Sequence, residues 1–261
     1  MDWEPVTRLG VFLAVFGAMA FAEARAPLRA ALRGRRWLTN LGLVALDSFL
    51  VRLVFPAAAV GAALHAEALG LGLFNALSWP FWFECLLAFV ILDFAIWAQH
   101  VAVHHVPLLW RLHQVHHADE AMDVTTGLRF HPVEILLSMA LKIGLVYLLG
   151  AAALAVLLFE IALNAAAIWS HANITLSRRA DRLLRLVIVT PDMHRSHHSV
   201  ERSEHDTNFG FFLSVWDRLF RVWTEQPAKG QGGVEIGLKP WRDGRSAGFL
   251  WSLALPFRRR P

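Results

Sequence analysis

The stretch Phe81–His117, FWFECLLAFVILDFAIWAQHVAVHHVPLLWRLHQVHH, runs from an apolar segment directly into a group of histidines. Its first half, Phe81–Ala98, is apolar enough and long enough to form one membrane-spanning helix, which needs about 20 residues. Its second half carries histidines at helical spacings: His100, His104, His113, His116 and His117. Residues three or four apart share one face of a helix, so we expect these imidazoles to converge at the end of a membrane span.

The composition of the whole chain also indicates a membrane protein. Of its 261 residues, 56% are hydrophobic and 18% are charged, whereas a soluble domain is about half apolar and about a quarter charged. The single cysteine, Cys85, excludes an internal disulfide and any Cys-based zinc or iron–sulfur site. The basic residues lie beside the apolar runs rather than in one patch, so we expect no nucleic-acid partner.

Four apolar stretches define the expected membrane layout: Val6–Ala22, Leu41–Leu64, Phe81–Ala98 and Ile135–Ser170. Each of the first three is long enough for one span. The fourth can form two short spans with a turn near Gly150, or a re-entrant hairpin that does not fully cross. We therefore predict an all-α integral membrane bundle with about four to five spans.

The basic residues predict how these spans are oriented. Arginines are frequent after the first span and after His171, whereas residues 65–80 and the turn at Gly150 contain no Lys or Arg. Under the positive-inside rule, this alternation places the N-terminus outside and every histidine patch on the cytoplasmic side. We expect an integral protein of the bacterial inner membrane whose active site faces the cytoplasm.

The histidines form more clusters than core packing requires, although a set of satisfied core histidines is the alternative interpretation. Neutral imidazole is the commonest protein metal ligand. The adjacent histidines within each triplet diverge by about 100°, which suits two metal ions better than one. His65 and His105 fall outside the pattern. Ten of the 13 histidines are candidate ligands: His100, His104, His113, His116, His117, His131, His171, His194, His197 and His198.

Three polar residues are candidates for orienting these ligands. Asp93 falls on the helical stripe of His100 and His104, where a carboxylate can accept the second N–H of a ligating imidazole and fix its tautomer. Packing between helices is its other interpretation. Asp206 and Asn208 follow the last histidine cluster and either orient it or form an ordinary polar turn.

Charged residues within the apolar stretches are costly in lipid and need their own interpretation. We expect Lys142 to extend its amine to the membrane surface, because it lies in the part of its span nearest the cytoplasm. Asp47 and Arg52 are expected to pair with each other or with another helix. Glu84 and Glu160 have no assigned role.

The combined motifs cover roughly residues 81–223 and resemble those of the fatty acid hydroxylase/sterol desaturase superfamily, whose members are integral membrane enzymes. Val101 stands where that family usually has arginine, which we interpret as the loss of a structural ion pair rather than of a ligand. The motifs follow one another in the order Asp93-Phe-x-x-Trp97, His100-x-x-x-His104, Pro107-Leu-Leu-Trp110-Arg111-x-His113-x-x-His116-His117, Arg129-Phe-His131-Pro132, His171-x-Asn173, Thr190-Pro191-x-x-His194-x-x-His197-His198, Asp206-x-Asn208-Phe209-Gly210 and Trp216-Asp217-Arg218-Leu219-Phe220.

This resemblance implies a membrane enzyme that uses two iron ions and O2 to hydroxylate or desaturate a lipid such as a sterol, a fatty acyl chain or an isoprenoid. It implies no catalytic residue beyond the metal ligands. Electrons would come from a separate partner: a reductase, a ferredoxin or a b-type cytochrome. The expected division of the chain is residues 1–80 for the N-terminal spans, 81–223 for the catalytic domain, and 224–261 for a C-terminal loop and interfacial tail.

Imidazole binds zinc, copper, iron and nickel alike, so the histidines do not select the metal by themselves. Zinc would give a membrane hydrolase, which is the alternative function, but no glutamate accompanies the clusters in the manner of His-Glu-x-x-His. A metal or proton transporter is less favoured. Its ionisable residues would follow a path through the membrane, whereas these histidines lie at the ends of spans.

Overall fold

The structure is a computed structural model that describes residues 3–30, 33–77 and 79–258. Regular structure in these residues is helical, with two isolated β-bridges. The longer helices are α1 (Glu4–Arg25), α2 (Arg35–Val54), α3 (Ala58–Ala68), α4 (Phe81–His105), α5 (Pro107–His117), α6 (Pro132–Leu149) and α7 (Ala153–His171). The shorter α-helices are α8 (Arg178–Leu184), α9 (Pro191–His197), α10 (Arg202–His205), α11 (Val215–Leu219), α12 (Gly230–Gly233) and α13 (Phe249–Ala254).

Five segments of the described chain are long and apolar enough to cross a membrane: α1, the pair α2–α3, α4, α6 and α7. The prediction of an all-α membrane bundle with four to five spans is confirmed. The second predicted span begins earlier than its apolar core, because α2 includes the polar residues from Arg35 onward.

Two breaks divide the long apolar stretches. Pro56 has no N–H and disfavours a helical residue before it, which explains why α2 ends at Val54 and α3 begins at Ala58. Gly150 ends α6 with φ of 65°, and a Cβ added there would lie 2.5 Å from the Leu71 carbonyl oxygen. The turn between α6 and α7 therefore packs tightly against the segment that precedes α4, and only glycine fits there.

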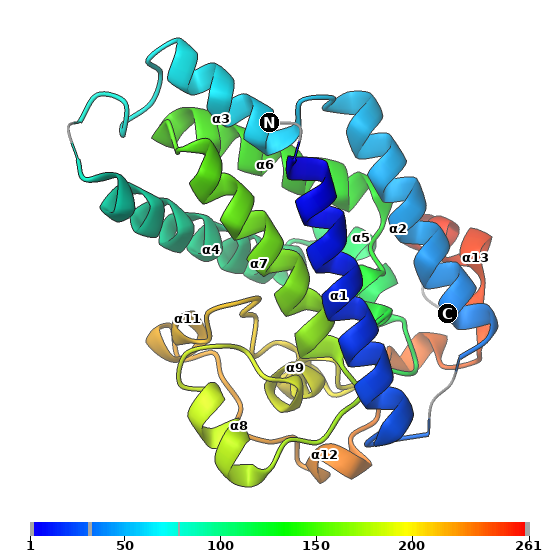
Figure 1. Cartoon of the computed structure of the whole chain (residues 1–261). Helices are drawn as coiled ribbons and strands as arrows, with labels where there is room; N and C mark the ends of the chain where they lie inside the picture. The colour runs from blue at the N-terminus through cyan, green and yellow to red at the C-terminus, as the bar shows by residue number, and fades with distance from the viewer. Residues whose placement is uncertain (1–2, 31–32, 78, 259–261) are drawn as a thin grey trace.

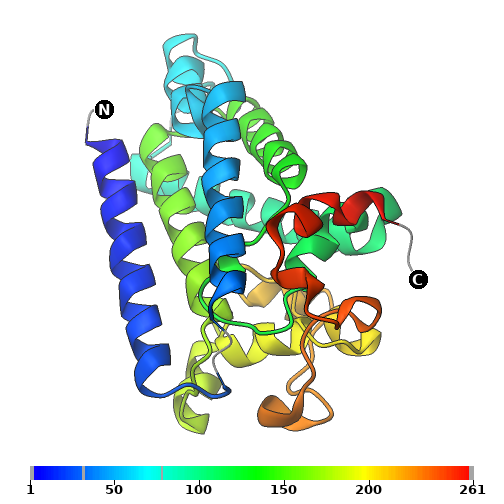
Figure 2. The same ribbon diagram turned by 90° about the vertical axis from the view of Figure 1, so that its right-hand side faces the viewer.

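The bundle has two distinct ends (Figure 1). The start of α1, the helix α3 and the turn between α6 and α7 lie at one end, while the C-terminal ends of α1 and α7 point toward the other. Figure 2 shows the same arrangement from the side, with α8, α9 and α12 at the second end and α13 (red) beside the long helices. The start of α1 thus lies opposite the end that receives the histidine clusters.

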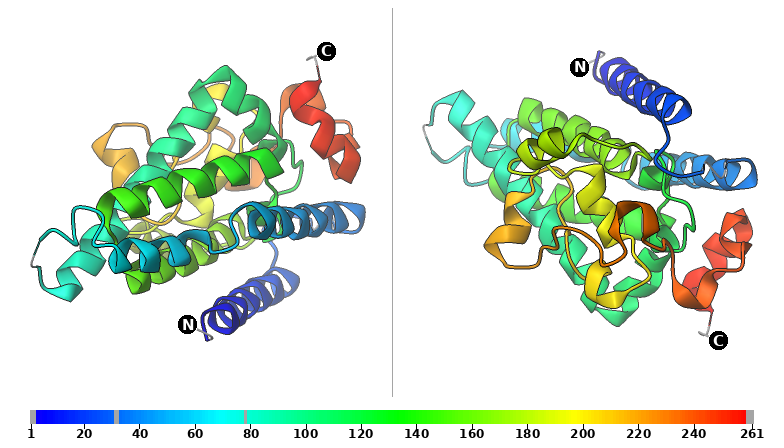
Figure 3. Two further views of the ribbon diagram at one scale, coloured as in Figure 1. Left: turned by 90° about the horizontal axis from the view of Figure 1, so that it is seen from above. Right: turned by 90° about the horizontal axis from the view of Figure 1, so that it is seen from below.

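The second end is covered by the C-terminal third of the chain. Seen from below, α8, α9 and α12 with their connecting loops lie across this end of the bundle (Figure 3). The last helix, α13, packs against α2, and the turn that follows it packs against α5. This cover encloses the histidine-bearing ends of α4, α5 and α7.

Candidate metal centre

Nine of the ten candidate histidines gather into two buried groups. Within each group the ligand nitrogens lie within 4.8 Å of one another. The first group consists of His100, His104, His113, His117 and His197. The second group consists of His116, His171, His194 and His198.

Four helix ends deliver these side chains. The ligand histidines of α4 and α7 lie near the C-terminal ends of these helices, and those of α5 lie in its C-terminal half. The others come from α9, a short helix that Thr190 caps by accepting the Met193 N–H. The adjacent residues of each triplet fall in different groups: His116 and His117 separate, as do His197 and His198. One turn of α5 and one turn of α9 therefore serve both groups at once.

Within the first group the imidazoles approach one another through their Nε2 atoms. The Nε2 of His100 lies 3.2 Å from that of His113 and 3.1 Å from that of His197. The Nε2 atoms of His104 and His117 are 3.1 Å apart. In the second group, the His171 Nε2 lies 3.1 Å from the Nε2 of each of its three neighbours.

The opposite ring nitrogens show which tautomers are present. Nδ1 faces an oxygen acceptor in His100 (Phe209 O, 2.7 Å), His113 (Glu134 Oε1, 2.7 Å), His116 (Arg129 O, 3.1 Å), His171 (Ala167 O, 2.6 Å) and His197 (Thr207 O, 2.7 Å). A carbonyl or carboxylate oxygen accepts a hydrogen bond, so each Nδ1 carries the proton. Each corresponding Nε2 then directs a lone pair into its group.

This arrangement fits bound metal ions. Facing lone pairs about 3 Å apart repel unless a cation lies between them. Two nitrogens that each lie about 2.1 Å from one metal ion, at right angles to each other, are about 3.0 Å apart, close to the observed separations. A hydrogen-bonded Nδ1 is also the usual partner of a metal-bound Nε2. The residues present can therefore hold one ion per group.

Burial keeps the ligands in the form that binds metal. Outside the spans, burial lowers the pKa of His116, His117, His194, His197 and His198 well below the ordinary histidine value, and neighbouring imidazoles lower it further. These rings are therefore neutral at neutral pH, and their lone pairs are available to a cation.

Asp93 does not have the role that the helical stripe predicts. Its Oδ2 accepts a 2.7 Å hydrogen bond from Trp216 Nε1 rather than from an imidazole. Asp217 is the carboxylate that supports His100, because it accepts from Trp97 Nε1 and from the Phe209 and Gly210 N–H groups at 2.8–2.9 Å. It thereby holds the Phe209 backbone, whose carbonyl accepts from His100. Burial raises the pKa of Asp217 to about 6, although these hydrogen bonds lower it.

Asp206 and Asn208 lie beside the site in different ways. The Asp206 Oδ1 is 3.4 Å from His104 Nδ1, which makes Asp206 a neighbour of the first group. Asn208 has left-handed backbone (φ of 56°) and donates to the carbonyl oxygens of Met193 and Thr224, so it holds the backbone of α9 rather than an imidazole.

His131 lies outside both groups. Its Nδ1 accepts the Val133 N–H and caps the start of α6, and its Nε2 is 3.3 Å from the Leu253 carbonyl oxygen. Because capping occupies the lone pair that a metal would need, we leave His131 out of the ligand set. His65 and His105 also lie outside both groups, next to Tyr147 Oη and the Val101 carbonyl oxygen.

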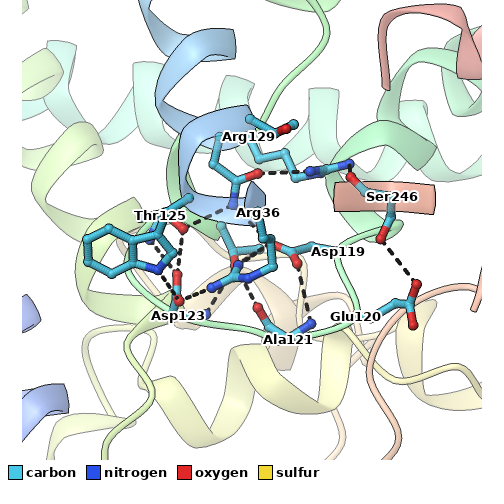
Figure 4. A network of polar contacts seen from close by, with 12 residues as sticks. Arg36, Asp119, Glu120, Ala121, Asp123, Thr125, Arg129 and Ser246 are labelled. Atoms are coloured by element: carbon cyan, nitrogen blue, oxygen red, sulfur yellow. Dashed lines mark hydrogen bonds and ion pairs between the residues drawn. The ribbon is translucent and has the colours of Figure 1, made fainter. Parts of the chain in front are cut away.

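A buried network of ion pairs and hydrogen bonds surrounds Arg36 and Arg129 (Figure 4). Arg129 is fully buried and donates to Asn40 Oδ1 and to the Val115 and Ser246 carbonyl oxygens. Its own carbonyl oxygen accepts from His116. The same network ties the start of α2 to the loop after α5, through ion pairs of Arg36 with two aspartates, Asp119 and Asp123.

The side chains of this network remain ionised although they are buried. Burial raises the pKa of Asp119, but the Arg36 and Arg129 guanidiniums, together with hydrogen bonds from Thr126 and Asn40, hold that pKa below its ordinary value. Neither this network nor Glu134 was predicted from the sequence. Glu134 comes 21 residues after its partner His113, and no helical spacing connects the two.

An all-helical bundle with two buried groups of histidines at the end of its spans defines a membrane protein of the histidine-cluster class. The chain belongs to the fatty acid hydroxylase family, whose model matches residues 85–222, more than half of its length. This confirms the resemblance found in the motifs.

Two kinds of relative are similar to this chain. The chain is 35% identical over 184 residues to an ornithine lipid hydroxylase, OlsE, of Rhizobium tropici, covering 70% of this chain and 53% of that one. It is 29% identical over 158 residues to the alkylglycerol monooxygenase of Homo sapiens, covering 60% of this chain and 34% of that one. The chain thus spans about half the length, or less, of these relatives. No solved structure matches it.

Proposed function

We propose that this chain is an O2-dependent membrane hydroxylase that acts on a lipid. The observation that carries the proposal is the convergence of two sets of Nε2 lone pairs at the end of a membrane bundle. The family supports an oxygenase, and the printed names of the relatives, a lipid hydroxylase and a monooxygenase, favour hydroxylation over desaturation. No observation favours the zinc hydrolase.

The nine converging histidines would hold two iron ions, which supply O2 activation when bound. The rest of the work falls to the protein. Glu134 orients His113, and the Arg129 carbonyl orients His116. Asp217 holds the Phe209 backbone, whose carbonyl orients His100. Burial of both groups excludes water. In the net reaction one atom of O2 is inserted into a C–H bond to give a hydroxyl. Two electrons and two protons reduce the other atom to water.

A cavity of about 280 Å³ joins the first group to the membrane region. His100 and His113 line it, together with side chains from α1, α2, α4, α6 and α7. Its position places a lipid beside the first group without passage through water. We propose that this cavity receives the substrate.

The two electrons require a donor, which we propose is a separate reductase, ferredoxin or b-type cytochrome. A second cleft of about 490 Å³ opens beside His104 and is bordered by basic residues such as Arg111, Arg202 and Lys239. Within it, the Trp110 ring stacks on His205 at 5.5 Å and lies 5.0 Å from His104. These aromatic contacts connect the basic surface to the first group, which supports donor docking on this face.

We further propose that residues 81–223 form the catalytic domain, and that the histidine end faces the cytoplasm of a bacterial inner membrane. The arginines after α1 and the basic residues after α7 lie at that end. A reporter that is active only in the cytoplasm should be active when fused to Pro261, and a reporter that is active only after export should be inactive there. Activity of an exported reporter instead would reverse the orientation.

The function is tested by labelled oxygen. Full-length protein in lipid membranes, loaded with iron and given a reductase system, should place one atom from ¹⁸O2 into a membrane lipid. His113→Ala should place none, because it removes a ligand of the first group. Label that enters from H2¹⁸O instead would indicate hydrolysis and would contradict the proposal.

A further inference from the structure

The cavity beside the first group contains carboxylate oxygens that have no partner. Asp47, on α2, is 5% exposed, and its Oδ1 has no hydrogen-bond partner in the part of the chain that the structure describes. Glu134 is 6% exposed; its Oε1 accepts from His113, but its Oε2 has no partner among the same residues. Both side chains line the cavity.

The other charges of the cavity are already paired. Glu160 accepts from Lys142 Nζ at 2.6 Å through one oxygen and from Arg8 at 2.5 Å through the other. Lys142 therefore does not extend to the membrane surface, contrary to the expectation from its sequence position. Arg52 is exposed, and no ion pair joins it to Asp47 among the described residues. None of these cations neutralises Asp47.

Asp47 lies deep within the membrane region, whereas Glu134 is in the first turn of α6. Asp47 is twelve residues from the start of α2, which at 1.5 Å per residue is about 18 Å along the helix. A buried acceptor without a donor costs free energy, and in a membrane it costs more. A hydrocarbon tail has no donor to offer such an acceptor, whereas a polar headgroup has one.

The size of the cavity favours the same occupant. Pockets for drug-sized ligands measure about 300–1,000 Å³, and this cavity of about 280 Å³ lies just below that range. It therefore suits a compact group better than a long acyl chain. Two further polar side chains, Gln99 and Ser138, also line it, and Ser138 Oγ donates to Gln99 Oε1 at 3.2 Å.

We propose that this cavity receives the polar headgroup end of a lipid, and that Asp47 accepts a hydrogen bond from a hydroxyl or amine of that headgroup. The inference rests on the proposed function and makes it more specific: the hydroxylated carbon belongs to the headgroup or adjoins it. Asp47 is then a specificity-determining residue, and the hydrocarbon tails remain in the surrounding bilayer.

Binding to metal-free protein tests the proposal independently of catalysis. Two matched pairs of probes have the same chains but differ in headgroup donors: 1-O-hexadecylglycerol against its dimethyl ether, and phosphatidylethanolamine against phosphatidylcholine. Native mass spectrometry of the full chain in detergent should show about tenfold or greater preference for the donor-bearing member of at least one pair.

Substitutions at Asp47 assign that preference to one side chain. Asp47→Leu should abolish it, whereas Arg52→Leu, on the same helix but outside the cavity lining, should leave it unchanged. Asp47→Asn keeps an acceptor oxygen without the charge, so it should retain a preference for hydroxyl donors and lose a preference for an amine. Equal binding of both members of each pair by the wild-type chain, or an unchanged preference in Asp47→Leu, would overturn the proposal.

The position of the incorporated oxygen separates this inference from the proposed function. Fragmentation of the ¹⁸O-labelled product should locate the label in the headgroup or on the carbon next to it. Label in the acyl chain away from the headgroup would overturn the inference and leave the hydroxylase intact. Absence of label from every lipid would count against the hydroxylase itself, and the binding preference would still be measured.

Discussion

The two histidine groups are equally buried but differ in what surrounds them. In the first group, His100 and His113 line the membrane cavity, and His104 lines the basic cleft. None of the four histidines of the second group borders either opening. The second group instead adjoins the network of Arg129 and Asp119, whose charges are satisfied within the protein.

This difference assigns separate tasks to the two groups. In the proposed function, substrate and electrons both reach the first group, which places the reacting carbon on its side. The second group would hold the other metal ion in a position that neither opening reaches. The two groups are nevertheless linked through the backbone, because the neighbours His116 and His117 belong to different groups, as do His197 and His198.

The largest expected effect tests whether metal binding in one group depends on metal binding in the other, because the two share turns of the backbone. His116→Ala, in the second group, and His197→Ala, in the first, should each lose both metal ions and reduce turnover at least about 100-fold. The reason is that loss of one ion leaves facing lone pairs that displace the shared turns of α5 and α9. Metal content by mass spectrometry is the measurement.

The matched controls for this experiment are His65→Ala and His105→Ala, which lie outside both groups and should keep full metal content. A different result would break the comparison. If His116→Ala kept one ion per chain at wild-type affinity, the two groups would be independent sites.

The next effect sharpens the comparison at the first group. Glu134→Gln weakens the hydrogen bond that orients His113 without removing a ligand, so turnover should fall about 10–100-fold while most of the metal remains. Asp217→Asn should act in the same direction through Phe209 and His100. Loss of all metal from Glu134→Gln would show that Glu134 is a ligand itself rather than an orienting residue.

A smaller effect is expected at the basic cleft. Arg111→Glu should raise the KM for an acidic electron-donor protein about 3–10-fold and leave kcat near the wild-type value, because it changes encounter rather than chemistry. The effect should shrink at high salt. Lys229→Glu, an exposed reversal away from the cleft, is the control, and equal KM changes in both variants would contradict docking at this face.

The smallest effect is expected at Asp93. Because its carboxylate accepts from Trp216 rather than from an imidazole, Asp93→Asn should change turnover less than about twofold and lower stability by about 1 kcal/mol. Thermal unfolding in detergent and steady-state turnover measure the two quantities. A tenfold fall in turnover with normal metal content would restore the ligand-orienting role predicted from the helical stripe.

The local features of this protein follow from its amino-acid sequence. The apolar runs located the spans, Gly150 located the turn between α6 and α7, and the spacing of the histidines showed that adjacent residues must diverge. These features depend on a few neighbouring residues and on the fixed geometry of a helix, so a one-dimensional pattern contains them.

Which groups meet across the fold depends instead on how the helices pack. Helix packing brings His113 next to Glu134 and Asp93 next to Trp216. His131 caps a helix, and Asp47 Oδ1 lies in a cavity without a partner among the described residues. A carboxylate on the right stripe of a helix contacts whatever the packing of other helices brings to it. Such contacts depend on the positions of distant segments, which residue spacing along one helix does not contain.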